Sequence, residues 1–211
     1  YVNSFRQAVS RREIDIRQMR LQIDDSATVG VLLASLESNQ PREINYALNM
    51  LQDVTSQNLI PAVRPLLEHA DADIRHKALR VLKTNGSTGD ELAATRLLED
   101  ENLQVRLAAL DLLKVDKPVE FLAQMLNGPG LCRNAALAFV MAPDAPLDWR
   151  LLVNAPQVDL ILADVTVQGQ EGRCILGESP WLPVGCEEKL WDRLLSDDDP
   201  LIVEAAVRGI G

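Results

Sequence analysis

Cysteine, histidine and aromatic residues are scarce in this 211-residue chain, and each shortage excludes a class of protein. The three cysteines are widely spaced and form no C-x-x-C pair, and neither of the two histidines lies near a cysteine in sequence. A disulfide framework or a zinc site is therefore not expected, and free thiols fit a reducing cytosol. Aromatic residues make up only 4% of the chain, so Leu, Val, Ile and Ala must build the core.

Long hydrophobic runs and catalytic motifs are missing as well. No stretch of 18 uncharged apolar residues occurs, so no segment is expected to span a membrane. The sequence at 169–172 lacks the Lys-Ser/Thr of a phosphate-binding loop, and no G-x-S-x-G elbow occurs. The aspartates at 197–199 lack the distal Glu of a calcium loop and fit a helix-capping turn better. We therefore expect no catalytic residue, no cofactor and no metal ion.

Positive charge is in short supply, yet it is concentrated at one end. The net charge of −10 disfavours binding to nucleic acid, because an acidic surface repels phosphate. Residues 1–23 nevertheless carry five arginines against two acidic residues, a net charge of +3, which leaves −13 on the remainder. This basic segment fits two interpretations equally well: proximity to the cytoplasmic face of a membrane, or a solvated helix face.

An internal repeat is the main feature that the chain does have. Ala followed by Leu or Val recurs at 47, 78, 109, 136 and 206, with steps of 31, 31 and 27 residues and then room for two repeats. Each pair lies in a segment with a polar start and apolar residues at i, i+3 and i+4, which predicts an amphipathic helix. Such segments include 71–82, 102–113, 130–140 and 197–210. A second apolar segment precedes each helix, at 29–38, 58–69, 89–100, 117–127 and 186–197.

These segments predict an all-α fold of the α-α superhelix type, a HEAT/armadillo-like solenoid with about five to seven helix pairs. Each unit is helix A, a turn and helix B. Pro65 is expected to bend its helix A. The predicted organisation is a basic lead-in helix at 1–28, regular repeats at 29–142, irregular or degraded repeats at 143–186 and a terminal repeat, cut short, at 187–211.

Charged residues recur in the predicted turns between helix A and helix B. Arg75, Arg106 and Arg133 occupy equivalent places, and Asp73 lies in the turn before the first of them. We predict that these residues form a ladder of exposed ion pairs between neighbouring repeats, each adding little stability. The alternative is a row that binds anions.

The segment 143–186 departs from the pattern because it is rich in Pro and Gly. Within it, residues 158–169 are rich in Val and Ile and partly alternating, so a short strand or hairpin is expected there. Trp149 and Trp181 bracket this stretch. Either they mark a contact site for a partner on a loop insertion, or the insertion is merely tolerated and the tryptophans fill the core.

The first part of the chain resembles a known family. The residues that carry the resemblance are Tyr1-Val2, the basic stretch 11–15 and the segment 46–51, which reads YALNML. They are similar to a bacterial multidomain family in which an ADP/ATP-translocase-like, major-facilitator-like membrane domain is followed by HEAT repeats and often by a cyclic-nucleotide-binding domain. The resemblance is strongest over residues 1–110. It implies architecture alone, since neither transport residues nor a nucleotide pocket falls within this chain.

Together these observations predict a non-catalytic HEAT-repeat module for protein interaction or regulation. Its expected partners are another protein or neighbouring domains of the same chain. The resemblance implies a cytoplasmic location, with tethering to the inner membrane in a longer bacterial protein. Two alternatives stay open: a free-standing soluble scaffold or adaptor, and a HEAT-like lyase or cofactor-handling protein.

Overall fold

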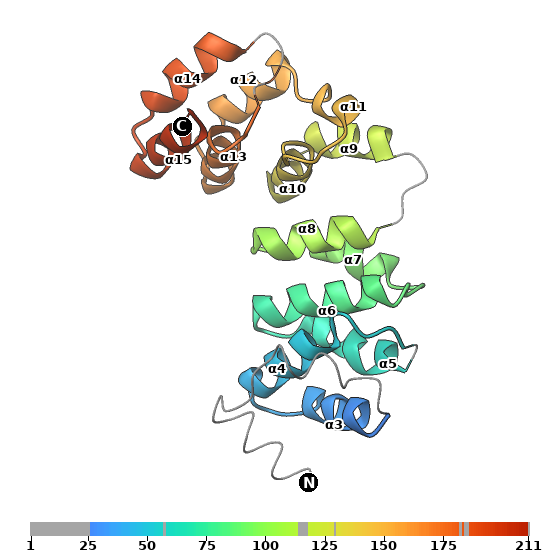
Figure 1. The fold of residues 1–211 in the computed structure, drawn as a ribbon. Coiled ribbons are helices and arrows are strands. Elements are labelled where there is room, and N and C mark those ends of the chain that lie inside the picture. Colours follow the sequence, from blue (N-terminus) through green and yellow to red (C-terminus); the bar gives the residue numbers. More distant parts are fainter. Residues whose placement is uncertain are drawn as a thin grey trace. The chain divides into compact units, whose positions relative to one another are not determined.

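A computed structural model describes residues 26–56, 58–113, 118–128, 130–181, 183 and 186–210, and this part of the chain is helical, without strands (Figure 1). The elements are α3 (Ser26–Leu36), α4 (Pro41–Leu51), α5 (Leu59–Val63), the 3-10 helix η1 (Arg64–Glu68), α6 (Ala72–Thr84), α7 (Glu91–Leu97), α8 (Leu103–Leu112), α9 (Pro118–Leu126), α10 (Gly130–Val140), α11 (Leu147–Arg150), α12 (Ala155–Ala163), α13 (Val167–Gly177), α14 (Glu187–Leu195) and α15 (Pro200–Ile210). The all-α prediction is confirmed. The lead-in helix predicted at 1–28 lies almost wholly outside the described residues.

The repeat pattern located the regular helices closely. Helix B segments predicted at 71–82 and 130–140 are α6 and α10, and the helix A segment at 117–127 is α9. Around Pro65, where a bend was predicted, the helix changes type: α5 ends at Val63 and the chain continues as the 3-10 helix η1. Proline has no N–H to bond the preceding turn, and its ring crowds that turn, so the α-helix cannot run on.

The strand or hairpin expected at 158–169 is wrong. This stretch forms most of α12 and the start of α13. Each helix has its own N-terminal cap: the Asn154 side chain accepts the backbone N–H of Gln157, and the Thr166 side chain accepts that of Gly169. These caps satisfy N–H groups that the first turn leaves open, and they outweigh the weak β-preference of the Val and Ile residues.

Glycines in α13 explain why a segment of low helix propensity is helical. A Cβ atom placed on Gly172 would lie 3.0 Å from the Asn134 side-chain oxygen, and one on Gly177 would lie 2.9 Å from the backbone nitrogen of Ala206. A side chain at Gly177 would meet backbone and one at Gly172 would have to displace the Asn134 side chain, so glycine at these positions lets α15 and α10 approach α13 closely. The packing gained at these contacts offsets the entropy that glycine loses in a helix.

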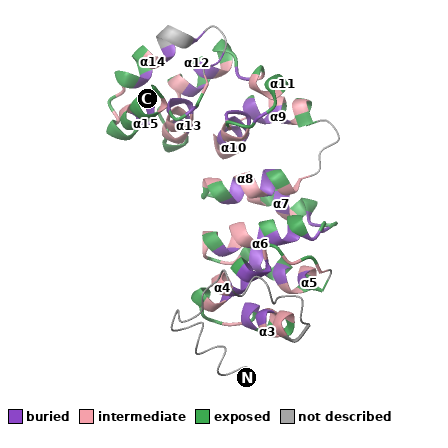
Figure 2. Cartoon of the chain, in the orientation of Figure 1, coloured by how far each residue is buried: buried purple, intermediate pink, exposed green. Residues whose placement is uncertain are grey.

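The chain divides into two compact units, residues 1–97 with 111–113 and residues 98–110 with 114–211, which we call the first and second units. In the first unit, α3 packs on α4, α4 on α6, and both α5 and η1 on α6. Its core is an aliphatic layer between these helices (Figure 2). Its fully buried members include Leu48, Leu51, Leu59, Ile74, Leu79 and Leu82.

In the second unit the helices pack in pairs that follow chain order. Contacts join α9 to α10, α12 to α13 and α14 to α15, and the later helix of each pair contacts that of the next, α10 on α13 and α13 on α15. Leu122, Leu126, Leu137, Ile161, Leu176, Leu194 and Ile202 form the buried layer. Among the described residues, no helix has both the length and the apolar character needed to cross a bilayer.

Candidate functional site

Arg75 and Arg106, at the start of two helix B segments, bond backbone carbonyls in the turn that precedes their own helix. Arg75 Nη1 donates to the carbonyls of His69 and Ala70, at 2.7 and 2.9 Å. Arg106 Nη1 donates in the same way to the carbonyls six and five residues before it, at 2.7 and 3.0 Å. Carbonyls that follow the end of a helix lack partners within it, so each arginine stabilises the turn of its own repeat. The sequence reasoning missed this contact.

Two arginines of the second unit also form ion pairs between successive helix pairs. Arg133 Nη2 on α10 lies 2.6 Å from a carboxylate oxygen of Asp164, in the turn before α13. Arg173 Nε on α13 lies 3.1 Å from Asp197, in the turn before α15. The expectation of exposed pairs is wrong here, because the Arg133 side chain is only 5% exposed and that of Arg106 is 0% exposed.

Glu171 on α13 gathers contacts from two other helices. Its Oε2 atom lies 2.5 Å from Arg106 Nη2 on α8 and 2.8 Å from Asn134 Nδ2 on α10. Asn134 Nδ2 also donates to the backbone carbonyl of Gln168, at 2.6 Å. One carboxylate oxygen therefore joins α8, α10 and α13. The adjacent polar pair Arg133-Asn134 inside an otherwise apolar segment was the sequence signal for this cluster, but it does not indicate the partner.

Asp164 has a strongly lowered carboxyl pKa. Hydrogen bonds from Thr166, whose hydroxyl lies 2.6 Å away, and from Arg133 lower its pKa from 3.8 to about 2, against the opposing effect of burial. The ionised carboxylate is the form that these donors stabilise. Asp164 is therefore a structural anion and not a proton donor at neutral pH.

Asp73, the remaining member of the predicted ladder, stays within its own helix. Its carboxylate lies 2.5 Å from Lys77 Nζ, one turn further along α6. Lys77 Nζ also donates to the side chain of Asn45 on α4, at 2.9 Å. The link between these two helix pairs thus runs through Lys77, which the turn-based pattern did not include.

A second buried carboxylate, Asp90, holds the loop before α7. It is 3% exposed, and it accepts bonds from Arg64 Nε at 2.5 Å and from the Ser87 hydroxyl. Burial alone would raise the pKa of Asp90, but the bonds from Arg64 and Ser87 bring it below its usual value. Asp90 and both of its partners lie in the first unit, so these contacts fit a role in stabilising the fold of that unit.

The two tryptophans that bracket the irregular segment are half-buried and packed. Trp149 stacks on Phe139, with ring centroids 5.5 Å apart and planes 24° apart. The guanidinium of Arg150 lies 5.3 Å from the ring centroid of Trp181. Both rings therefore have contacts inside the second unit, as the core-filling alternative describes.

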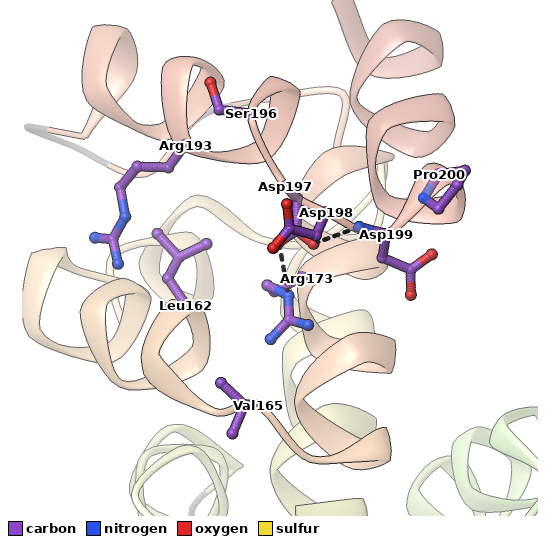
Figure 3. Close-up of a pocket in the computed structure, with 9 residues that line it drawn as sticks. All are labelled: Leu162, Val165, Arg173, Arg193, Ser196, Asp197, Asp198, Asp199 and Pro200. Atoms are coloured by element: carbon purple, nitrogen blue, oxygen red, sulfur yellow. Dashed lines mark hydrogen bonds and ion pairs between the residues drawn. The ribbon is translucent and has the colours of Figure 1, made fainter.

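A surface groove lies at the other end of the second unit, where the α12–α13 and α14–α15 turns meet (Figure 3). It is open and has a volume of about 760 Å³. Leu162, Val165 and Pro200 supply apolar side chains, and the aspartates at 197–199 lie together above Arg173. The sequence reasoning assigned this aspartate run to a helix cap, and Asp199 does accept the backbone N–H of Leu201, at 2.9 Å.

The charges lining the groove do not cancel. Arg173 is engaged by Asp197, and Arg193 lies 2.8 Å from Asp159, so both cations already have a carboxylate partner. Within the part of the chain that the structure describes, Asp199 accepts hydrogen bonds from two neutral donors, the Gln170 side chain and the Leu201 backbone. Asp198 is exposed and accepts no hydrogen bond from the described residues. The groove therefore presents two carboxylates whose charge is uncompensated.

The side chains of Cys132, Cys174 and His69 are less clearly arranged for a function than the groove is. Burial raises the pKa of the Cys132 and Cys174 thiols, which disfavours the thiolate that nucleophilic chemistry needs. His69 Nδ1 accepts the backbone N–H of Asp71, at 2.9 Å, inside the turn before α6. Within the described ranges, no group of three or more His, Cys, Asp or Glu residues is placed to hold a metal ion.

Comparison with protein-family models finds no match for this chain, and comparison with curated proteins finds none either. The family resemblance of the first 110 residues therefore stays a prediction.

Proposed function

We propose that this chain is a HEAT-like α-solenoid module that binds a protein partner and performs no catalysis. The observation that carries the proposal is the stacking in the second unit: α10 contacts α13, α13 contacts α15, and a partly buried ion pair closes each junction. Helix pairs that contact their neighbours in sequence are the building principle of solenoids, and such proteins generally use their extended surfaces for binding.

The hydrogen-bond pattern of the turns supports the same proposal. Arg75 and Arg106 make the same two backbone contacts in different repeats, which indicates a repeated structural unit and not merely a repeated composition. The charged side chains singled out by the sequence are largely engaged in internal contacts. Binding is therefore assigned to exposed surface, of which the groove at the α12–α13 and α14–α15 turns is the best defined.

Site-specific photo-crosslinking in the native cells tests this function. A photo-reactive residue replaces Val165, at the groove, or Leu92, an exposed residue of α7 that serves as the control. A crosslinked product that forms at position 165 and not at position 92 supports a binding module. If neither position gives a product above the mass of the chain itself, the proposed function is wrong.

We further propose that the module belongs to a longer membrane-attached bacterial protein, as the resemblance and the +3 charge of residues 1–23 imply. An antibody raised against residues 26–113 distinguishes this from a free-standing scaffold. A band well above 23.3 kDa that sediments with membranes supports attachment. A band near that mass in the soluble fraction favours the free scaffold instead.

A further inference from the structure

We infer that the groove at the α12–α13 and α14–α15 turns binds a peptide segment of a partner protein in which an Arg or Lys adjoins an aliphatic residue. The inference deepens the proposed function and rests on it. The groove combines an apolar wall with uncompensated negative charge, and a segment of that composition complements both (Figure 3).

The apolar wall is unusually exposed. Val165, which lines the groove, is 90% exposed, and Val167 nearby in the chain is 82% exposed. Leu201, which follows the groove residue Pro200, is 59% exposed. Single exposed apolar residues are common in soluble proteins, but one that lines a concave surface, as Val165 does, offers a contact for a partner. An aliphatic side chain of the partner would remove this surface from water.

The negative charge at the groove favours a positively charged group of the partner. The Asp198 carboxylate is exposed and accepts no hydrogen bond from the described residues, and no basic group among those residues contacts Asp199. Phosphate or carboxylate ligands are disfavoured, because Arg173 and Arg193 already have carboxylate partners. A guanidinium or ammonium group supplies the charge-assisted donors that free carboxylate oxygens accept.

The shape of the groove favours a peptide over a small cofactor. Its volume of about 760 Å³ falls within the range of about 300–1,000 Å³ seen for ligand sites. An enclosed cavity would be needed to bury most of a small molecule, whereas this groove is open along the turns (Figure 3). An open groove can accept two neighbouring side chains of an extended segment while the rest of that segment stays in solvent.

The probe is a fluorescein-labelled octapeptide of alternating Leu and Arg, measured by fluorescence anisotropy with the full chain. Two matched peptides separate the contributions: alternating Leu and Glu keeps the apolar content and reverses the charge, and alternating Ser and Arg keeps the charge without the apolar side chains. We expect the Leu/Arg peptide to bind tightest and to weaken as salt is raised, since exposed ion pairs are screened.

Asp198→Asn and Val165→Ser test the groove itself, and both residues are exposed, so neither change removes core packing. Each is expected to weaken the Leu/Arg peptide about fivefold, as loss of roughly 1 kcal/mol implies. The controls Asp148→Asn and Leu147→Ser alter an exposed acidic residue and an exposed apolar residue on α11 and should leave binding unchanged.

Three results would overturn the inference: no binding of the Leu/Arg peptide, equal binding of the Leu/Glu peptide, or equal losses from the groove and α11 variants. Displacement of the peptide by stoichiometric calcium would also overturn it, because it would make the aspartates a cation site. The proposed function is tested separately by the photo-crosslinking. If a partner crosslinks at positions other than the groove, the chain is still a binding module with a different contact surface, and only the inference about the groove fails.

Discussion

Replacing Arg106 with Met is expected to destabilise the second unit by about 3 kcal/mol, the lower end of the range for breaking a buried ion pair. The Arg106 side chain is 0% exposed, and it bonds Glu171 and two backbone carbonyls of its own turn. Methionine fills similar volume without donors, so the three acceptors lose their partner. The cost stays at the lower end because Glu171 is 27% exposed and keeps its bond from Asn134.

A double-mutant cycle separates the ion pair from the contacts to the turn. Arg106→Met, Glu171→Gln and the double variant are unfolded with urea and followed by circular dichroism, and the coupling free energy is taken from the four stabilities. We expect a coupling of about 2 kcal/mol or more, because the guanidinium has no access to water. The exposed pair Arg208–Glu178, with side chains 60% and 54% exposed, provides the control and should give less than about 1 kcal/mol.

The cycle can refute this reasoning in two ways. If Arg106→Met costs less than about 1 kcal/mol, the buried arginine is not a structural element of the second unit. If the single variant is costly but its coupling to Glu171 matches that of the exposed control pair, the stability comes from the carbonyls of the turn and the joining role of Glu171 is wrong.

Three further predictions concern packing and pH. Gly177→Ala should lower the thermal midpoint, at a cost of about 1–3 kcal/mol, because its Cβ would lie 2.9 Å from a backbone nitrogen of α15, whereas Gly30→Ala, with nothing within 4 Å, should raise the midpoint. Asp164→Asn should cost about 1–2 kcal/mol at neutral pH. Since the folded pKa of Asp164 is lowered from 3.8 to about 2, its contribution to the free energy of unfolding is present above pH 3.8 and is lost as the pH falls towards 2. Urea unfolding of the unmodified protein and of Asp164→Asn across this range should show the difference between their free energies of unfolding shrinking. A constant difference would contradict the stabilising role of the ionised carboxylate. Trp149→Leu should cost about 1 kcal/mol through loss of stacking and reduce the near-ultraviolet circular dichroism signal; an unchanged spectrum would show that the stack does not order the ring.

The regular helices could be predicted from the sequence because their signals are local. In α6 and α10 a polar start, a small residue and apolar residues at i, i+3 and i+4 lie within a dozen positions, and the observed bounds follow that pattern. Pro65 likewise acts on the turn that directly precedes it. Each of these features is decided by residues that are close in sequence.

The missed features depend on residues far apart in the chain. The helix α13 contains three glycines, Gly169, Gly172 and Gly177, and it is stable because α10 and α15 pack closely on it. Glu171 lies 65 residues from Arg106, and no local pattern connects them. The groove was missed for the same reason, because it forms only where two separate turns meet.

The arginine at the start of helix B has two contacts because its geometry permits both. A guanidinium carries five donors in a planar fork, so Arg106 can bond the carbonyls of its own turn through Nη1 and a carboxylate on another helix through Nη2. A lysine at that position has a single nitrogen and cannot satisfy groups on opposite sides. Recurrence of arginine in the turns therefore reflects a requirement of the stack itself, and the exposed side chains of Val165 and Asp198 are better placed than these arginines to bind a partner.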